Sequence, residues 1–261
     1  MKKIAAIILA AGQGSRMQSK KVNKVVYPLG KKQMILYTVE RLADLSSTFL
    51  KPRRKKVLDL FISPIIVIVG FAKESVIKIL EGKVIFAYQN QRLGTAHALM
   101  CGLKKLPGDI GAVLVLNGDD SAFYTESIIK KLIKTHWAKN AALSFLTITV
   151  ENPMGLGRVI RDGNGKAVGI VEEKDATLVQ RKINEINPAC YIFEVDFLKK
   201  YLKQVKKSEV TGEYYLTSLI DIAIKNNEQI ETMRGGKIAW RGINTPKELL
   251  EAERLFSVIK K

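Results

Sequence analysis

Continuous apolar stretches and amphipathic stretches alternate through the first half of the chain. Apolar segments of this kind are typical of strands buried on both faces of a parallel sheet, and they lie at residues 4–9, 65–69, 84–88 and 112–116. Helices are expected at residues 33–45, 73–81, about 96–106 and 125–139. This alternation implies right-handed crossovers, so it predicts a doubly wound, mostly parallel α/β sheet.

The pattern changes after Lys139 and becomes richer in β-forming residues. A long strand is expected at 141–150, and residues 158–161 and 167–171 flank Asp162-Gly163-Asn164-Gly165, a strong hairpin signal. Further short strands are expected at 191–195, 230–233 and 238–240, with helices near 197–205 and 214–226. We interpret this half as a mixed sheet that extends the first one and forms one face of a shared cleft.

Composition limits the class of protein. A chain of 261 residues with 47% hydrophobic content can form one α/β domain with a large core. No apolar run approaches the ~20 residues of a membrane-spanning helix, so we expect no membrane partner. The N-terminus only faintly resembles a signal peptide, and Cys101 and Cys190 lack metal-ligand spacing. We therefore expect a cytoplasmic protein with reduced core thiols.

The formal charge of +18 favours anionic partners. Lysines are spread over most of the expected helices, which favours a solvated basic surface. The basic connection at residues 46–60 carries Lys51-Pro52-Arg53-Arg54-Lys55-Lys56 and is either a solvated loop or a contact for polyanions. A nucleic-acid-binding protein is thus an alternative, but the aromatic stacking platforms expected for binding single strands are missing, so we expect no specific nucleic acid.

A glycine-rich turn follows the first apolar segment, in Leu9-Ala10-Ala11-Gly12-Gln13-Gly14-Ser15-Arg16-Met17. Such a turn aims backbone N–H groups at a phosphate, and Arg16 and Lys24 supply positive charge. Met17 stands where the dinucleotide-binding fingerprint needs a small residue, and no Gly-Lys-Ser/Thr follows Gly14 as in nucleoside triphosphatases. From these residues alone, an ordinary strand–helix turn remains an alternative.

Two oxygen-bearing side chains are candidate metal ligands. Asp119 follows the strand at 112–116, so its carboxylate is expected at the carboxyl edge of the sheet, where it suits Mg²⁺ or caps a turn. Asn244 precedes Thr245-Pro246-Lys247-Glu248, which is typical of a capping box with Pro at the first helical position. Asn244 is thus either held rigidly as a ligand or serves only as part of the cap.

Short motifs across most of the chain carry a resemblance to a known family. In chain order they are Leu9-Ala10-Ala11-Gly12, Gln89 with Leu93-Gly94-Thr95-Ala96-His97-Ala98, Gly118-Asp119, Asn152-Pro153 with Gly155, Gly157 and Arg158, Gly169 to Thr177, Glu185-Ile186-Asn187, Gly212 to Thr217, and Gly242-Ile243-Asn244. The sequence resembles the sugar-1-phosphate nucleotidyltransferases, most closely the uridylyltransferase half of the bifunctional bacterial enzyme that makes UDP-N-acetylglucosamine. The hexapeptide β-helix of the acetyltransferase half is not present in this sequence.

The resemblance implies a nucleotide-diphospho-sugar transferase fold of one domain. Its nucleotide-binding half would span residues 1–140, its sugar-binding half 141–243 and a C-terminal helix 244–261. The family pattern also implies the roles of individual residues. Arg16 and Lys24 would be catalytic; Leu9, Ala10, Ala11, Gly12, Gly14, Gln89, Gly94 and Thr95 would bind the nucleotide; Gly118, Gly157, Glu172 and Asn187 would bind the sugar; Asp119 and Asn244 would hold Mg²⁺.

The resemblance predicts uridylyl transfer from UTP to a sugar 1-phosphate, N-acetylglucosamine 1-phosphate foremost. Thymidylyl transfer to another sugar phosphate and a non-catalytic nucleotide-binding regulator are alternatives. Thr95 is expected to cap the following helix while it faces the base, and His97 to pack or cap and not to act as a catalyst. The simpler interpretation of Glu172 is a salt bridge to Lys174 or Arg158. The oligomeric state is left open.

The chain departs from the family pattern at three places. Asn117 and Asp120 flank Gly118-Asp119, where the family usually has Tyr-Gly-Asp-x-Pro, and Asp120 would either join the metal site or face solvent. Asn187 is followed by Pro188-Ala189-Cys190 instead of Thr-Gly, and Asn23 stands where the family often has Pro. These departures weaken the assignment of N-acetylglucosamine specifically.

Overall fold

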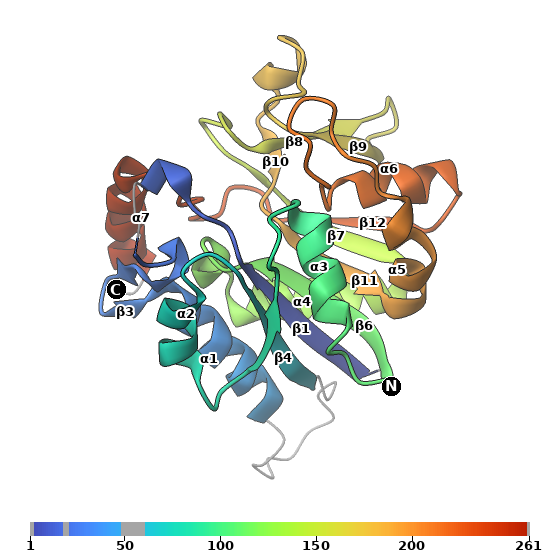
Figure 1. Cartoon of the computed structure of the whole chain (residues 1–261). Helices are drawn as coiled ribbons and strands as arrows, with labels where there is room; N and C mark the ends of the chain where they lie inside the picture. Colours follow the sequence, from blue (N-terminus) through green and yellow to red (C-terminus); the bar gives the residue numbers. More distant parts are fainter. Residues whose placement is uncertain (1–2, 18–20, 48–60, 260–261) are drawn as a thin grey trace, which may run out of the picture.

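The computed structural model describes residues 3–17, 21–47 and 61–259 (Figure 1). Most of the basic connection predicted at 46–60 lies outside these residues. None of the helices in the described ranges is long and apolar enough to cross a membrane.

Four parallel strands form the first part of the sheet, in the order β5-β4-β1-β6. They are β1 (Lys3–Ala10), β4 (Ile62–Val69), β5 (Ile85–Tyr88) and β6 (Ile110–Asn117). The strand order reverses at β1, which has β4 on one side and β6 on the other. Open α/β sheets bind ligands at the carboxyl ends of the strands at such a reversal. Here those ends are Leu9 and Asn117, which are register partners.

The second part of the sheet is mixed, and β11 joins it to the first part by pairing antiparallel with both β6 and β7. One ten-stranded sheet therefore runs through both halves of the chain. Its remaining strands are β7 (Leu143–Thr149), β8 (Gly157–Arg161), β9 (Ala167–Val171), β10 (Glu185–Asn187), β11 (Cys190–Glu194) and β12 (Ile230–Arg234). A separate two-stranded ribbon consists of β2 (Pro28–Leu29) and β3 (Lys32–Gln33).

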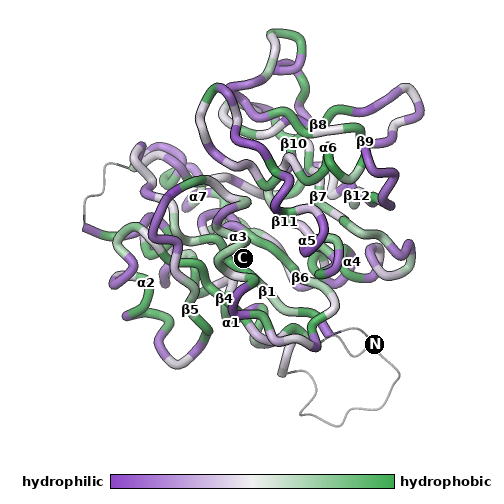
Figure 2. Tube along the Cα trace, turned by 45° about the vertical axis from the view of Figure 1, so that its right-hand side comes forward, coloured by the Kyte–Doolittle hydropathy of each residue, from purple (hydrophilic) through white to green (hydrophobic). Residues whose placement is uncertain are grey.

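Helices cover both faces of the sheet (Figure 1). One buried cluster joins alternate residues of β1 to the first set of helices, which comprises α1 (Met34–Ser47), α2 (Lys73–Leu80) and α4 (Glu126–Ala138). A second cluster joins the other residues of β1 to the second set, which comprises α3 (Thr95–Leu103), α5 (Val195–Tyr201) and α6 (Ser218–Lys225). Figure 2 shows hydrophobic residues concentrated along the central strands, as the continuous apolar stretches predict for strands buried on both faces.

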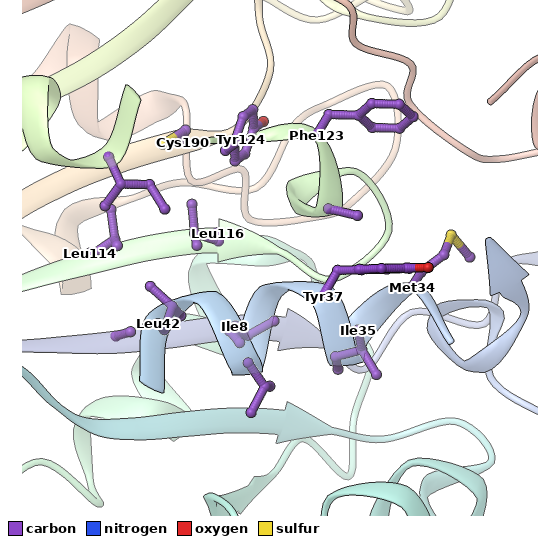
Figure 3. Packing of buried hydrophobic residues seen from close by; sticks show 14 of the residues in the cluster. Ile8, Met34, Ile35, Tyr37, Leu42, Leu114, Leu116, Phe123, Tyr124 and Cys190 are labelled. Atoms are coloured by element: carbon purple, nitrogen blue, oxygen red, sulfur yellow. The ribbon is translucent and has the colours of Figure 1, made fainter. Parts of the chain in front are cut away.

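The last helix, α7 (Pro246–Ile259), returns to the N-terminal half of the chain (Figure 1). The Phe256 ring lies 4.8 Å from the ring of Tyr37 on α1 and 5.6 Å from the ring of Phe123, measured between centroids. Figure 3 shows Tyr37 and Phe123 at the edge of the cluster that packs α1 against the sheet. Burial of these aromatic rings fixes the position of α7, and with it that of Asn244 just before the helix.

The predicted order of elements is largely confirmed; two predictions are corrected, and one strand appears where none is predicted. Residues 238–240 do not form a strand. The helix predicted at 214–226 begins only at Ser218, because Tyr214 instead exchanges backbone hydrogen bonds with the segment before α3. Residues 185–187, for which no strand is predicted, form strand β10, which pairs with both β7 and β8.

Candidate active site

Two cavities open at the carboxyl ends of β1 and β6. The larger has a volume of about 610 Å³ and lies over the glycine-rich turn. The smaller, of about 440 Å³, lies between this turn and the mixed part of the sheet. Both cavities share a wall, and the residues on it are Leu9, Lys24, Thr95, Asn117, Asp119, Glu213 and Asn244. A ligand of two parts can therefore place one part in each cavity, with the two parts meeting beside these shared residues.

Every residue predicted to bind the nucleotide lines the larger cavity. The glycine-rich turn bends through Gly14, whose φ of +57° lies in the left-handed region that glycine adopts without strain. The backbone N–H of Met17 donates to the Gly14 carbonyl at 2.7 Å and closes the turn. Two charged residues without a predicted role also line this cavity: Arg92, whose guanidinium donates to the Gln13 side chain, and Glu213, which is exposed.

Arg16 lies on the exposed side of the glycine-rich turn and lines the smaller cavity. Its guanidinium reaches the loop at Gly155, where an added methyl group would lie 3.9 Å from a terminal nitrogen of Arg16. The loops from the two halves of the chain thus approach each other through Arg16. This position suits a cation that contacts a phosphate between the two cavities.

Asn23 is completely buried and holds the glycine-rich turn in place. Its amide nitrogen donates to the carbonyl oxygens of Ala10 at 2.9 Å, Gly12 at 3.2 Å and Phe71 at 2.9 Å. Its amide oxygen accepts from the N–H of Val25 at 3.2 Å and so caps the 3₁₀ turn that carries Lys24. A proline at this position would lack these bonds, so the departure from the family pattern has a structural use in this chain.

Lys24 joins the two predicted metal ligands. Its ammonium group forms an ion pair with the Asp119 carboxylate and donates to the Asn244 amide oxygen at 3.0 Å and to the Ile243 carbonyl at 3.3 Å. The side chains of Lys24 and Asp119 are only 15% and 13% exposed. These three residues come from the segment between β1 and α1, the end of β6 and the start of α7, so tertiary structure alone brings them together.

The predicted capping box at α7 is confirmed, and Thr245 is its cap. The N–H of Glu248 donates to the Thr245 hydroxyl at 3.2 Å, while the Glu248 carboxylate accepts from the Asn244 N–H at 2.9 Å. The Asn244 side chain takes no part in the cap. Its amide oxygen is therefore able to point at Lys24 and the cavity wall.

Gln89 and Gly94 lie together in the larger cavity. The buried Gln89 amide nitrogen donates to the Gly94 carbonyl at 2.9 Å and lies 3.0 Å from Nδ1 of His97. Gly94 has a φ of +102°, and a methyl group on it would lie 2.5 Å from the Tyr214 carbonyl oxygen. Glycine is thus required by the close approach of the Tyr214 backbone, and His97 orients Gln89, as expected for a packed histidine.

The capping role considered for Thr95 is wrong. Helix α3 begins at Thr95 itself, Gly94 is the cap residue, and no side chain caps the helix. The Thr95 hydroxyl accepts from the N–H of Leu216 at 2.9 Å, because residues 214–216 run alongside the start of α3. Thr95 therefore ties the two halves of the chain together at the shared wall.

Three of the four residues predicted to bind the sugar line the smaller cavity: Gly157, Glu172 and Asn187. The fourth, Gly118, lies beneath the site, where its N–H donates to the Leu9 carbonyl at 3.0 Å. The salt bridge considered for Glu172 is wrong. Glu172 accepts from the Thr217 hydroxyl at 2.9 Å, whereas Arg158 pairs with Glu173 at 2.5 Å. Burial raises the pKa of Glu172, although the hydrogen bond from Thr217 opposes this effect.

Asp120 does not face solvent. It is 4% exposed and lines the smaller cavity, and within the described residues its Oδ1 atom has no hydrogen-bond partner. Burial and then the neighbouring Asp119 carboxylate raise the pKa of Asp120 well above its usual value, although the charge of Lys24 opposes them.

Asp119 and Asn244 fit a Mg²⁺ site. Both present an oxygen to one ammonium group, so a small cation at that point is within reach of both, and carboxylate and amide oxygens are the hard ligands that Mg²⁺ takes. Among the residues that the structure describes, no three His, Cys, Asp or Glu side chains gather as a metal site. A site with two protein ligands and remaining positions for phosphate and water is typical of Mg²⁺.

Comparison with known families defines the class of protein. The model of the nucleotidyl transferase family matches residues 5–257, almost the whole chain. The chain therefore belongs to the nucleotidyl transferase family.

The chain is also similar to curated proteins over almost its whole length. The chain is 41% identical over 255 residues to the bifunctional protein GlmU of Caldicellulosiruptor saccharolyticus, covering 97% of this chain and 52% of that protein. It is 37% identical over 257 residues to the bifunctional protein GlmU of Geobacillus sp. (strain WCH70), covering 98% and 52%. The chain spans about half the length of these relatives.

A solved structure shares the fold. A putative glucose-1-phosphate thymidylyltransferase from Bacillus anthracis, in complex with a sucrose, superposes with a TM-score of 0.76 at 22% identity. The match covers 97% of this chain and 94% of that one. At this level of identity the likeness concerns the fold, which is that of the nucleotide-diphospho-sugar transferases.

Proposed function

We propose that the chain catalyses Mg²⁺-dependent transfer of a uridylyl group from UTP to a sugar 1-phosphate, N-acetylglucosamine 1-phosphate foremost, releasing pyrophosphate. The observation that carries this proposal is the contact of Lys24 with Asp119 and Asn244 on the wall shared by two cavities. The nucleotide occupies the larger cavity and the sugar the smaller, so their phosphates meet at Lys24.

The reaction requires charge stabilisation and positioning more than proton transfer. A sugar 1-phosphate is already an oxyanion near neutral pH, so its attack on the α-phosphorus of UTP needs no general base. The barrier lies in bringing two anions together and in stabilising the departing pyrophosphate. Lys24 lies between nucleophile and α-phosphate, while Arg16 and the N–H groups of the glycine-rich turn neutralise the phosphates.

Asp119 and Asn244 hold the metal in this proposal. Bound Mg²⁺ supplies additional positive charge to the phosphates. Lys24 occupies the position between these two side chains in the structure. Mg²⁺ held by Asp119 and Asn244 would take over their oxygens, and the Lys24 ammonium group would then be available to the substrate phosphates. The Asp119 carboxylate would thus have a cationic partner both without the ion, when it pairs with Lys24, and with the ion bound.

The base-binding part of the larger cavity contains Gln89 and Gly94. Because the Gln89 amide nitrogen is held by Gly94 and His97, its amide oxygen is the part left to accept from the N–H of a pyrimidine. Thymidylyl transfer is the second candidate, because the Bacillus anthracis protein with the same fold is a putative glucose-1-phosphate thymidylyltransferase.

A pyrophosphate-release screen tests this function. Four nucleoside triphosphates are assayed against a panel of sugar 1-phosphates, with and without Mg²⁺. We expect release with UTP and an N-acetylhexosamine or hexose 1-phosphate, and only with Mg²⁺. Release with dTTP alone would favour the second candidate, and no release with any pair would contradict both. A gel-shift assay with RNA at physiological salt tests the nucleic-acid alternative.

A further inference from the structure

Asp120 is a buried residue on the wall of the smaller cavity. The reaction described above does not use its carboxyl group. Its Oδ1 atom is shielded from solvent and has no hydrogen-bond partner within the described residues. A buried acceptor left in this state costs about 1–3 kcal/mol, so native proteins usually provide it with a donor.

The hydroxyl groups next to Asp120 have other partners, while Nε1 of Trp240, which lines the same cavity, is also buried without a partner among the described residues. Asp120 precedes the 3₁₀ turn Ser121–Phe123 but its side chain does not cap it. The Ser121 hydroxyl lies 2.8 Å from the Thr38 hydroxyl and also donates to the Asn117 carbonyl, while the Tyr124 hydroxyl donates to the Pro188 carbonyl. These hydroxyl groups therefore leave Oδ1 of Asp120 without a donor among the described residues.

The amide group of Asn187, which lines the same cavity, is hydrogen-bonded within the protein on both sides. The Asn187 amide nitrogen donates to the Tyr191 hydroxyl, and its amide oxygen accepts from the N–H of Ala189 at 3.0 Å. Ala189 is held at a φ of +54°, which places a methyl group on the cavity wall where the backbone favours glycine. This wall thus carries the carboxyl group of Asp120 and the methyl group of Ala189. Both residues belong to segments in which the chain departs from the family pattern.

We propose that Asp120 is a specificity-determining residue that forms a hydrogen bond with an O–H or N–H group on the ring of the sugar 1-phosphate. This inference rests on the proposed function. Because Arg16 and Lys24 hold the phosphate at the shared wall, the sugar enters the smaller cavity in one orientation and presents one ring substituent to Asp120. The chain therefore selects sugars that carry a donor at that position.

A substrate-by-variant comparison tests this inference. The substrate is N-acetylglucosamine 1-phosphate or glucose 1-phosphate, whichever reacts faster with the wild type, together with its monodeoxy analogues. The kcat/KM of each is measured with wild type, Asp120→Ala, Asp120→Asn and the distant surface control Asp109→Ala. At one ring position, we expect the wild type and the control to prefer the parent sugar by about tenfold or more. We expect Asp120→Ala to lose most of that preference and Asp120→Asn, whose uncharged amide oxygen accepts a weaker hydrogen bond, to lose part of it.

The outcomes separate the possible roles of Asp120. The inference would be overturned if the wild type and the Asp120 variants preferred the parent sugar over each monodeoxy analogue by the same factor. It would also be overturned if the variants only required more Mg²⁺, to the same extent with every sugar. Thermal unfolding shows whether each variant folds, and Asp120→Asn keeps the volume of the side chain if the alanine variant does not. No product with the wild type and any sugar would instead refute the proposed function, and this inference with it.

Discussion

The ammonium group of Lys24 donates a hydrogen bond to the amide oxygen of Asn244 at 3.0 Å, across 220 residues of chain. The same ammonium group pairs with Asp119 at the end of β6. The start of the last helix is thereby attached to the centre of the N-terminal half of the chain. The two candidate metal ligands and the candidate catalytic cation therefore form one group.

Replacement of Lys24 by alanine is expected to lower kcat by about 100-fold or more, because the cation between the two phosphates is lost. Lys21→Ala is the matched control, since Lys21 is exposed and belongs to the same segment. Steady-state kinetics with UTP and the best sugar 1-phosphate measure both variants. A kcat within about threefold of the wild type for Lys24→Ala would show that Lys24 does not act in the reaction.

Asp119→Asn is expected to raise the Mg²⁺ concentration for half-maximal rate by about tenfold or more, because a neutral amide replaces a charged ligand. The control Asp196→Asn removes a carboxylate that is 94% exposed on α5. Rates measured over a Mg²⁺ titration distinguish the two variants. An unchanged Mg²⁺ dependence in Asp119→Asn would place the metal elsewhere.

Asn23→Ala is expected to lower the free energy of unfolding by about 2–4 kcal/mol, because three carbonyl oxygens and one N–H lose their buried partner. It should also raise the KM for UTP more than the KM for the sugar, since the Gly12 carbonyl belongs to the nucleotide side. Denaturant unfolding and steady-state kinetics measure these effects, with the exposed Asn164→Ala as control. Equal stability in both variants would contradict the role of Asn23.

The Arg161–Glu185 ion pair between β8 and β10 predicts a pH dependence of stability. Burial is the largest single influence and raises the pKa of Glu185. The hydrogen bonds from Arg161 at 2.7 and 2.5 Å, a smaller contribution from Thr147 and the charges of Arg161 and Arg234 together outweigh it, so the pKa lies below its usual value. A carboxyl group with a lowered folded pKa stabilises the fold above its unfolded pKa of about 4.3, and this contribution disappears as pH falls through the folded value.

Glu185→Gln should therefore be less stable than the wild type by about 1–2 kcal/mol at pH 7, and the difference should shrink as the pH falls below about 4. Urea unfolding at a series of pH values measures this difference. A difference that stays constant between pH 7 and pH 3 would show that the Glu185 charge does not contribute.

The elements were predictable where the pattern is local. The continuous apolar residues of β1 and the capping box at Thr245 depend on neighbours in sequence, and both are confirmed. The sequence predicts a helix that includes residues 214–217, which are not helical in the structure. Their contacts with Leu93 and Thr95 are long-range, so no periodic pattern in the local sequence indicates them. Local sequence could not show which elements these residues pair with.

The candidate site was likewise predictable only in part. The motifs predicted the residues of the larger cavity, because a turn after a strand places them together. The role of Asn23 was missed, although a polar residue directly before Lys24 was a visible departure from the family pattern. The burial of Asp120 was also missed, because it depends on tertiary packing: residues as distant in sequence as Tyr191 and Trp240 line the same cavity.

The central claim is that the two substrates meet directly at Lys24, with no covalent intermediate on the protein. The stereochemistry at the α-phosphorus of UTP tests it most directly. The reaction is run with one diastereomer of uridine 5′-O-(1-thiotriphosphate), and the configuration of the UDP-sugar product is determined by ³¹P NMR. A single in-line displacement predicts inversion at phosphorus, whereas retention would require a uridylylated protein and would contradict the account.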